Sequence, residues 1–187
     1  MTAFITALLM VVLAELGDKT QLLAMAFATR FNWKTVMAAI TVATIVNHLF
    51  AILIGVYLNS LIHMETIKII ASLAFIFFGL WTIRGDTLDG EDTKDRFNPF
   101  WTVAIAFFAA EMGDKTQLAT ITIAAQFGQL VPILCGTTLG MVIADGFGII
   151  AGIVLNKHLP AKQIRYVAAA IFILCGVAGL TVSFGLV

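Results

Sequence analysis

The chain has 187 residues, of which 60% are hydrophobic and only 12% are charged, and its formal net charge is zero. Its mean hydropathy is +1.01. Soluble domains carry about 25% charged residues, so this composition excludes an ordinary soluble protein. The absence of any Lys/Arg-rich block also argues against nucleic acid as a partner. The composition instead predicts an all-α integral membrane protein whose main partner is the lipid bilayer.

Six apolar stretches are long enough to cross a membrane, which takes roughly 20 residues of helix. They lie near residues 3–28, 35–58, 66–83, 100–126, 131–155 and 164–186. The first begins at Met1 without a basic segment and continues through a charged motif, so we expect a true span rather than a cleaved signal peptide. The longest hydrophilic connection is an acidic linker at residues 85–99.

The basic residues of the connections are distributed very unevenly. The first, third and fifth connections hold eight of them, and the other side has only Lys68. The eight are Arg30, Lys34, Arg84, Lys94, Arg96, Lys157, Lys162 and Arg165. Cytoplasmic loops carry the excess of Lys and Arg, so we expect the linker at 85–99 to be cytoplasmic and both termini to be non-cytoplasmic.

A nine-residue motif occurs twice in the chain. Ala14–Leu22 reads AELGDKTQL and Ala110–Leu118 reads AEMGDKTQL, with eight identities at an offset of 96 residues. At an offset of 97, the small residues of the second span align with those of the fifth. The aligned rows are Ala39, Ala43, Asn47, Ala51 and Gly55 against Gly136, Gly140, Ala144, Gly148 and Gly152. The four-residue period predicts a packing face on each span.

The repeat unit is therefore three helices long, with residues 1–84 as the first unit and residues 100–187 as the second. Because each unit has an odd number of spans, the second enters the membrane from the opposite side. This predicts six transmembrane helices arranged as two inverted-topology repeats, the plan of many secondary transporters. The packing faces could serve within a monomer or across a homodimer, and the sequence leaves that choice open.

The acidic residues of the two motifs are the candidate metal ligands. Glu15 and Glu111 each lie near the middle of their span, and inversion would bring them together near the midplane. Asp18 and Asp114 follow three residues later, so we expect each pair to point its carboxylates along one helix face. The glycine between them permits either close helix contact or a helix break, and the sequence does not decide between the two.

The rest of each motif supplies neutral oxygens and one cation. Thr20, Thr116, Gln21 and Gln117 complete a set of oxygen donors without His or Cys, which suits a hard divalent cation such as Mn²⁺ or Ca²⁺. Lys19 and Lys115 stand four residues after the glutamates. We expect each to pair with the glutamate of its own motif while the metal is absent.

Three further polar residues lie inside predicted spans. Asp145 is a fifth intramembrane acid, and it is either a proton relay, a ligand or a packing partner. Its counterpart in the first repeat is His48, which is either a proton carrier or a packing residue. Asn47 beside it either contacts metal or makes a cross-helix hydrogen bond. The acids outnumber the two motif lysines, so the empty site should bind cations or take up protons, and competition between the two would be antiport.

The twin Glu-Leu/Met-Gly-Asp-Lys-Thr segments, three spans apart and separated by an acidic loop, closely resemble a known cation/proton exchanger family. It includes Golgi calcium and manganese transporters and bacterial manganese exporters, and it belongs to the lysine-exporter superfamily. The resemblance covers the whole chain. It implies that the acids of both motifs, here Glu15, Asp18, Glu111 and Asp114, are ion ligands.

The resemblance further implies a transporter rather than an enzyme, with no cofactor, that exports Mn²⁺ from the cytoplasm in exchange for protons. The chain lacks the long amino-terminal extension of organellar members, so we expect a multi-pass protein of the bacterial inner (plasma) membrane. Two alternatives remain open on the residues, a Ca²⁺/H⁺ antiporter and an exporter of a cationic amino acid or other small solute. A passive cation channel or a non-transporting assembly factor is a third class.

Overall fold

The computed structural model describes residues 1–84, 98–155 and 161–184, and within them every regular element is an α-helix. The helices are α1 Thr2–Glu15, α2 Lys19–Arg30, α3 Trp33–Leu61, α4 Met64–Arg84, α5 Pro99–Glu111, α6 Lys115–Phe127, α7 Leu130–Leu155 and α8 Ala161–Ser183. The expected all-α class is thus confirmed. Most of the acidic linker, residues 85–97, lies outside the described residues.

The apolar runs near 3–28 and 100–126 are each divided into two helices rather than forming one. By length and composition, the described part of the chain has two helices able to cross a membrane, α3 and the Leu130–Ile150 part of α7. Helices α1 and α5 are apolar but shorter. Each division falls at the charged motif, which places the motifs where backbone groups leave the regular helical pattern.

Local signals set several of the helix ends. The side chains of Asn32 and Asn98 accept hydrogen bonds from backbone N–H groups two residues on, at 2.9 and 3.0 Å, and so begin α3 and α5. Pro99 follows at the first helical position, where its missing N–H costs nothing. Helix α6 ends at Gly128, whose φ of 63° is left-handed and suits glycine.

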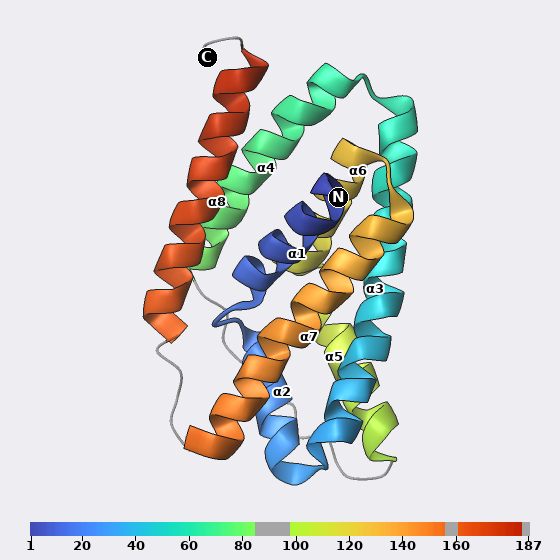
Figure 1. Ribbon diagram of the computed structural model, residues 1–187, viewed down its shortest axis with the longest axis vertical. Helices are drawn as coiled ribbons and strands as arrows, with labels where there is room; N and C mark the ends of the chain where they lie inside the picture. The colour runs from blue at the N-terminus through green and yellow to red at the C-terminus, as the bar shows by residue number, and fades with distance from the viewer. Residues whose placement is uncertain (85–97, 156–160, 185–187) are drawn as a thin grey trace.

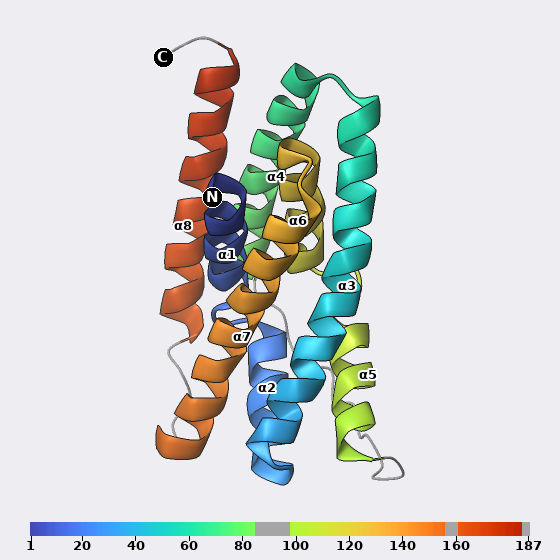
Figure 2. The ribbon, with the colours of Figure 1, turned by 45° about the vertical axis from the view of Figure 1, so that its right-hand side comes forward.

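The chain runs in opposite directions through its two divided segments (Figures 1 and 2). The α1–α2 segment descends in Figure 1, whereas the α5–α6 segment ascends. Helix α1 contacts α6, and α2 contacts α5. The first helix of each divided segment therefore contacts the second helix of the other segment. The packing of the long helices is reciprocal as well, because α1 packs on α7 while α5 packs on α3.

The connections lie at two ends of the bundle. The α2–α3 connection, the start of α5 and the end of α7 are at the lower end in Figure 1, and the α3–α4 and α6–α7 connections are at the upper end. Residues 85–97 of the third connection and 156–160 of the fifth lie outside the described residues, so the expected grouping of the first, third and fifth connections stays a prediction.

The predicted packing faces of the second and fifth spans are confirmed. Ala39, Ala43, Asn47, Ala51 and Gly55 are all buried on α3. A Cβ added at Gly140 would lie 3.0 Å from the backbone oxygen of Leu8 on α1, so α1 and α7 approach each other closely. Both faces thus pack within the chain. Helices α4 and α8 lie side by side along one flank, with their own glycines at the contact (Figure 1).

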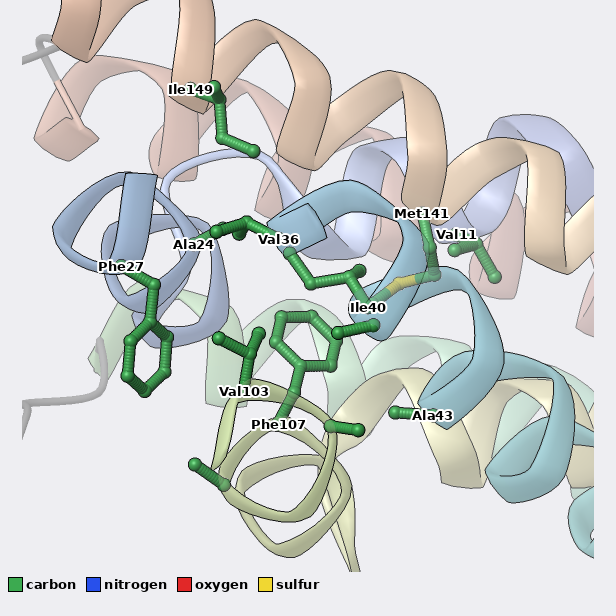
Figure 3. Packing of buried hydrophobic residues seen from close by; sticks show 13 residues of the cluster. Val11, Ala24, Phe27, Val36, Ile40, Ala43, Val103, Phe107, Met141 and Ile149 are labelled. Carbon is green, nitrogen blue, oxygen red and sulfur yellow. The ribbon is translucent and has the colours of Figure 1, made fainter. Parts of the chain in front are cut away.

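Two apolar clusters enclose the motifs. One is formed mainly by α2, α3, α5 and α7, and Figure 3 shows Phe107 and Val103 of α5 pointing toward Ile40 and Val36 of α3. The other includes residues of α1, α3, α4, α6 and α8, among them Ile52, Ile123 and Phe172. The glutamates at the ends of α1 and α5, Glu15 and Glu111, are buried.

Candidate metal transport site

Both motifs break their helix at the glycine. Glu15 is the last residue of α1 and Asp18 is the N-cap of α2, and between them Gly17 has a φ of 78°. In the second motif Gly113 has a φ of 79°, a left-handed value that only glycine adopts readily. The expectation that Glu15 and Asp18 share one face of a continuous helix is therefore wrong. The left-handed glycine turns the chain between them, so that the two carboxylates belong to different helices.

The motif glutamines cap these breaks. The side-chain oxygen of Gln21 accepts a hydrogen bond from the Gly17 backbone N–H at 2.9 Å, and that of Gln117 accepts one from Gly113 at 2.7 Å. The amide nitrogen of Gln21 also donates to the backbone oxygen of Ala144 on α7 at 2.7 Å. The glutamines thus satisfy backbone groups that the breaks release, which matters because lipid cannot do so. Their predicted part in metal or proton transfer stays a prediction.

Each motif glutamate is buried and accepts a hydrogen bond from the threonine of its own motif. The Thr20 hydroxyl donates to a carboxylate oxygen of Glu15, and the Thr116 hydroxyl donates to one of Glu111. The second carboxylate oxygen of each glutamate has no hydrogen-bond partner among the described residues. A buried carboxylate oxygen left in this way is available to a cation or a proton.

Each motif lysine forms an ion pair with the aspartate of the opposite motif. Lys115 forms an ion pair and hydrogen bond with Asp18, and Lys19 forms an ion pair with Asp114 at 3.3 Å. We expected partners in Glu15 and Glu111 on the basis of four-residue helical spacing. The breaks remove that spacing, since each lysine begins a new helix, and the nearest ion pairs are instead with the opposite motif. Antiparallel contact of the two segments, which the inverted repeat implies, is the signal that would have indicated this pairing.

Three further predicted residues lie on the long helices around the motifs. Asn47 on α3 accepts a hydrogen bond from the side-chain nitrogen of Gln117, a cross-helix contact of the kind expected as one alternative. His48 and Asp145 are fully buried at repeat-related positions on α3 and α7. Neither side chain has a hydrogen-bond partner among the described residues. A packing role alone would leave those polar groups unsatisfied, which is costly in a protein interior.

The acids form one electrostatically connected group. Glu15 interacts with Glu111, Asp145 and Asp18, and Glu111 interacts with Asp114. As they stand, though, the described residues contain no set of three or more His, Cys, Asp or Glu side chains placed to hold a metal ion. The two motif aspartates are instead in ion pairs with lysines, and the two motif glutamates accept hydrogen bonds from threonines.

An apolar helix bundle that buries five carboxylates around two broken helices has the organisation of a secondary transporter of cations. Comparison with protein families agrees. The chain belongs to the GDT1 family, described as divalent cation/proton antiporters, and the family model matches residues 3–90 and 99–185. The protein is accordingly a membrane transporter and not an enzyme. The resemblance inferred from the twin motifs is confirmed.

The individual relatives span most of this chain. A Vibrio cholerae protein named "Putative manganese exporter" is 38% identical over 170 residues, covering 90% of this chain and 85% of its own length. A Synechocystis GDT1-like protein is 26% identical, covering 95% of this chain and 96% of its own length. GDT1-like protein 5 of Arabidopsis thaliana is 28% identical, with coverages of 95% and 94%. No solved structure matches the chain.

Proposed function

We propose that this protein exports Mn²⁺ from the cytoplasm in exchange for protons, using Glu15, Asp18, Glu111 and Asp114 as the ion ligands. The observation that carries the proposal is the buried acidic group itself. Five carboxylates meet only two lysines there, in a bundle with an apolar exterior. An excess of buried negative charge is unfavourable unless cations or protons neutralise it.

The proposed topology is six membrane spans in two inverted repeats, residues 1–84 and 100–187. The opposite directions of the two divided segments and the reciprocal packing of α1 on α7 and α5 on α3 support it (Figure 1). The family match is interrupted between the two repeats, at residues 91–98. The excess of Lys and Arg in odd-numbered connections further supports a cytoplasmic linker and non-cytoplasmic termini in a bacterial inner membrane.

Mn²⁺ as the substrate is supported by two lines. The donors around the breaks are carboxylate, hydroxyl and amide oxygens, which suit Mn²⁺ and Ca²⁺. The Vibrio cholerae relative carries manganese export in its name. Ca²⁺ remains the second candidate because the same oxygens accept it.

The contacts suggest how exchange occurs. In this structure Lys115 and Lys19 neutralise Asp18 and Asp114. An entering divalent cation displaces the two ammonium groups from the aspartates in turn, one on each side, and the free oxygens of Glu15 and Glu111 complete its ligands. Protons arriving from the other side neutralise the carboxylates and release the cation. His48 and Asp145, buried without hydrogen-bond partners, are the proposed proton-handling groups beside this path.

Transport in proteoliposomes tests this function. The protein should move Mn²⁺ when a pH gradient is imposed, and a protonophore should abolish the gradient-driven part. Flux that ignores the gradient would instead describe a channel and overturn the proposal. Running Ca²⁺ in parallel decides the substrate, since a preference for Ca²⁺ would reject manganese while retaining exchange.

Variants test the site. Asp114→Asn should abolish exchange, whereas Thr122→Val should not, because the Thr122 hydroxyl bonds only within its own helix in this structure, to Leu118 at 2.9 Å. Asp18→Asn alone removes the charge of Asp18 from the buried Lys115–Asp18 ion pair, a loss of about 3–5 kcal/mol for such pairs. The double variant Asp18→Asn, Lys115→Gln removes both charges and should fold yet not transport. Wild-type exchange in the aspartate variants would refute the ligand assignment.

A further inference from the structure

The two ion pairs between the motifs contain the same residue types but differ in exposure. The side chain of Lys115 is 4% exposed and that of Lys19 is 26% exposed, while both aspartate partners are 1% exposed. The motifs themselves are almost identical in sequence. The difference therefore comes from how the surrounding helices are arranged, and it describes the conformation of the protein.

The two helix breaks next to these ion pairs also differ in their exposure. Met112, which follows Glu111, is 54% exposed, whereas its counterpart Leu16 is partly buried. Gly113 is exposed, and a Cβ added there would meet nothing within 4 Å, whereas Gly17 is buried. The second break is therefore exposed, whereas the first is buried.

We propose that Lys19–Asp114 and Lys115–Asp18 are the two alternate closures of one transport path, and that in this structure the Lys19 closure is accessible and ready to open while the Lys115 closure is buried and shut. A cation approaching Asp114 has to displace a lysine that already reaches the surface. Approach to Asp18 requires a buried ammonium group to leave its partner. The inference rests on the proposed exchange function, because alternate closures have meaning only for a two-sided path.

The repeat relation supplies the second state. If the helices of the two halves exchange their arrangements, Lys115 becomes the exposed lysine and Lys19 becomes the buried one. In that state Leu16 is exposed and Met112 is partly buried. Inverted-repeat transporters alternate by such an exchange. Lys19 and Lys115 are then positioning residues with opposite effects, since each holds one side shut. Removing Lys115 favours the second state, and removing Lys19 favours the present one.

Cysteine labelling tests this directly. In a background in which Cys135 and Cys175 are alanine, Leu16→Cys and Met112→Cys serve as matched reporters in membrane vesicles of known orientation. A membrane-impermeant maleimide is added from either face. We expect Met112→Cys to react from one face only and faster than Leu16→Cys.

Adding Lys115→Gln should slow labelling at position 112 and speed labelling at position 16, from the opposite face, by about tenfold or more for loss of a buried ion pair. Lys19→Gln should leave position 112 fast, and Lys115→Arg should restore the parental pattern. If Lys115→Gln does not fold, the double variant Asp18→Asn, Lys115→Gln should give the same shift.

Two results would overturn the proposal. One is equal labelling at both positions in every variant. The other is no labelling at position 112 from either face, which would mean that Met112 faces lipid. Labelling requires no metal or proton flux, so it separates this inference from the proposed function. Absence of Mn²⁺/H⁺ exchange with an intact labelling shift would reject the function and keep the alternate closures, and the reverse result would do the opposite.

Discussion

Replacing Gly113 by alanine tests whether the helix breaks are needed. The φ of Gly113 is 79°, and a Cβ there would meet nothing within 4 Å, so the substitution adds backbone strain without a clash. A left-handed conformation costs an alanine about 1–2 kcal/mol. The loss should therefore be about 1–2 kcal/mol in the free energy of unfolding, and it acts specifically against the broken conformation. Asparagine adopts left-handed backbone more readily, so Gly113→Asn should lose less.

Thermal unfolding of the purified protein measures this loss. For a chain of this size, 1–2 kcal/mol corresponds to a Tm lower by roughly 2–8 °C. Gly146→Ala is the matched control, because a Cβ at Gly146 also meets nothing within 4 Å but the residue lies inside α7. Alanine there should be neutral or stabilising. Gly113→Ala should also reduce metal transport, as alanine favours a continuous helix through the site. If Gly113→Ala matches the parent, or if Asn is no better than Ala, left-handed backbone at the break is not required.

Three other substitutions follow from the contacts. Gly55→Ala should destabilise by about 1–3 kcal/mol, because the added Cβ would lie 2.9 Å from the backbone nitrogen of Ala125 on α6, and equal stability in thermal unfolding would contradict that close packing. Asn98→Ala should cost about 0.5–2 kcal/mol by removing the cap that accepts from Phe100, and an unchanged Tm would show that the cap contributes nothing. Gln21→Leu should cost about 1–3 kcal/mol by leaving the buried backbone N–H of Gly17 at the first break unsatisfied, with hydrogen exchange at that amide as the readout and unchanged exchange as the opposing result.

The packing of the long helices was predictable because it depends on short-range periodicity. Small residues every four positions from Ala39 to Gly55 must lie on one helix face, and a face of small residues buries itself against a neighbour. The structure buries that row on α3 and brings Gly136 and Gly140 of α7 against α1. No knowledge of the partner helix was needed for the prediction, although the identity of the partner required the structure.

The breaks were only half predictable. A glycine inside an apolar run is compatible with close helix contact, with a bend or with a full break, and the choice depends on whether released backbone groups find partners. Here Gln21 and Gln117 supply those partners from one turn away. The sequence contained both halves of that arrangement, the glycine and the glutamine four residues later, but it did not show that they meet.

The cross-repeat ion pairs were the least predictable part of the site. Four-residue spacing indicated Glu15 as the partner of Lys19, a local argument that holds only in an unbroken helix. Once the helix breaks, pairing is decided by tertiary contacts between segments 97 residues apart, as for Lys115 and Asp18. Local periodicity carries no information about such contacts.

The lysines bear on why the cargo should be divalent. Two ammonium groups, on Lys19 and Lys115, neutralise two of the motif carboxylates in this structure. A divalent cation that replaces both of them leaves the total positive charge beside the carboxylates unchanged, although the buried ammonium group of Lys115 must then leave its partner. A monovalent cation making the same displacement would leave one more uncompensated negative charge in a medium that disfavours it. Under the proposed exchange the two lysines would therefore favour a divalent cargo without being ligands, whereas the choice between Mn²⁺ and Ca²⁺ would fall to the proposed ligand oxygens of Glu15, Asp18, Glu111 and Asp114.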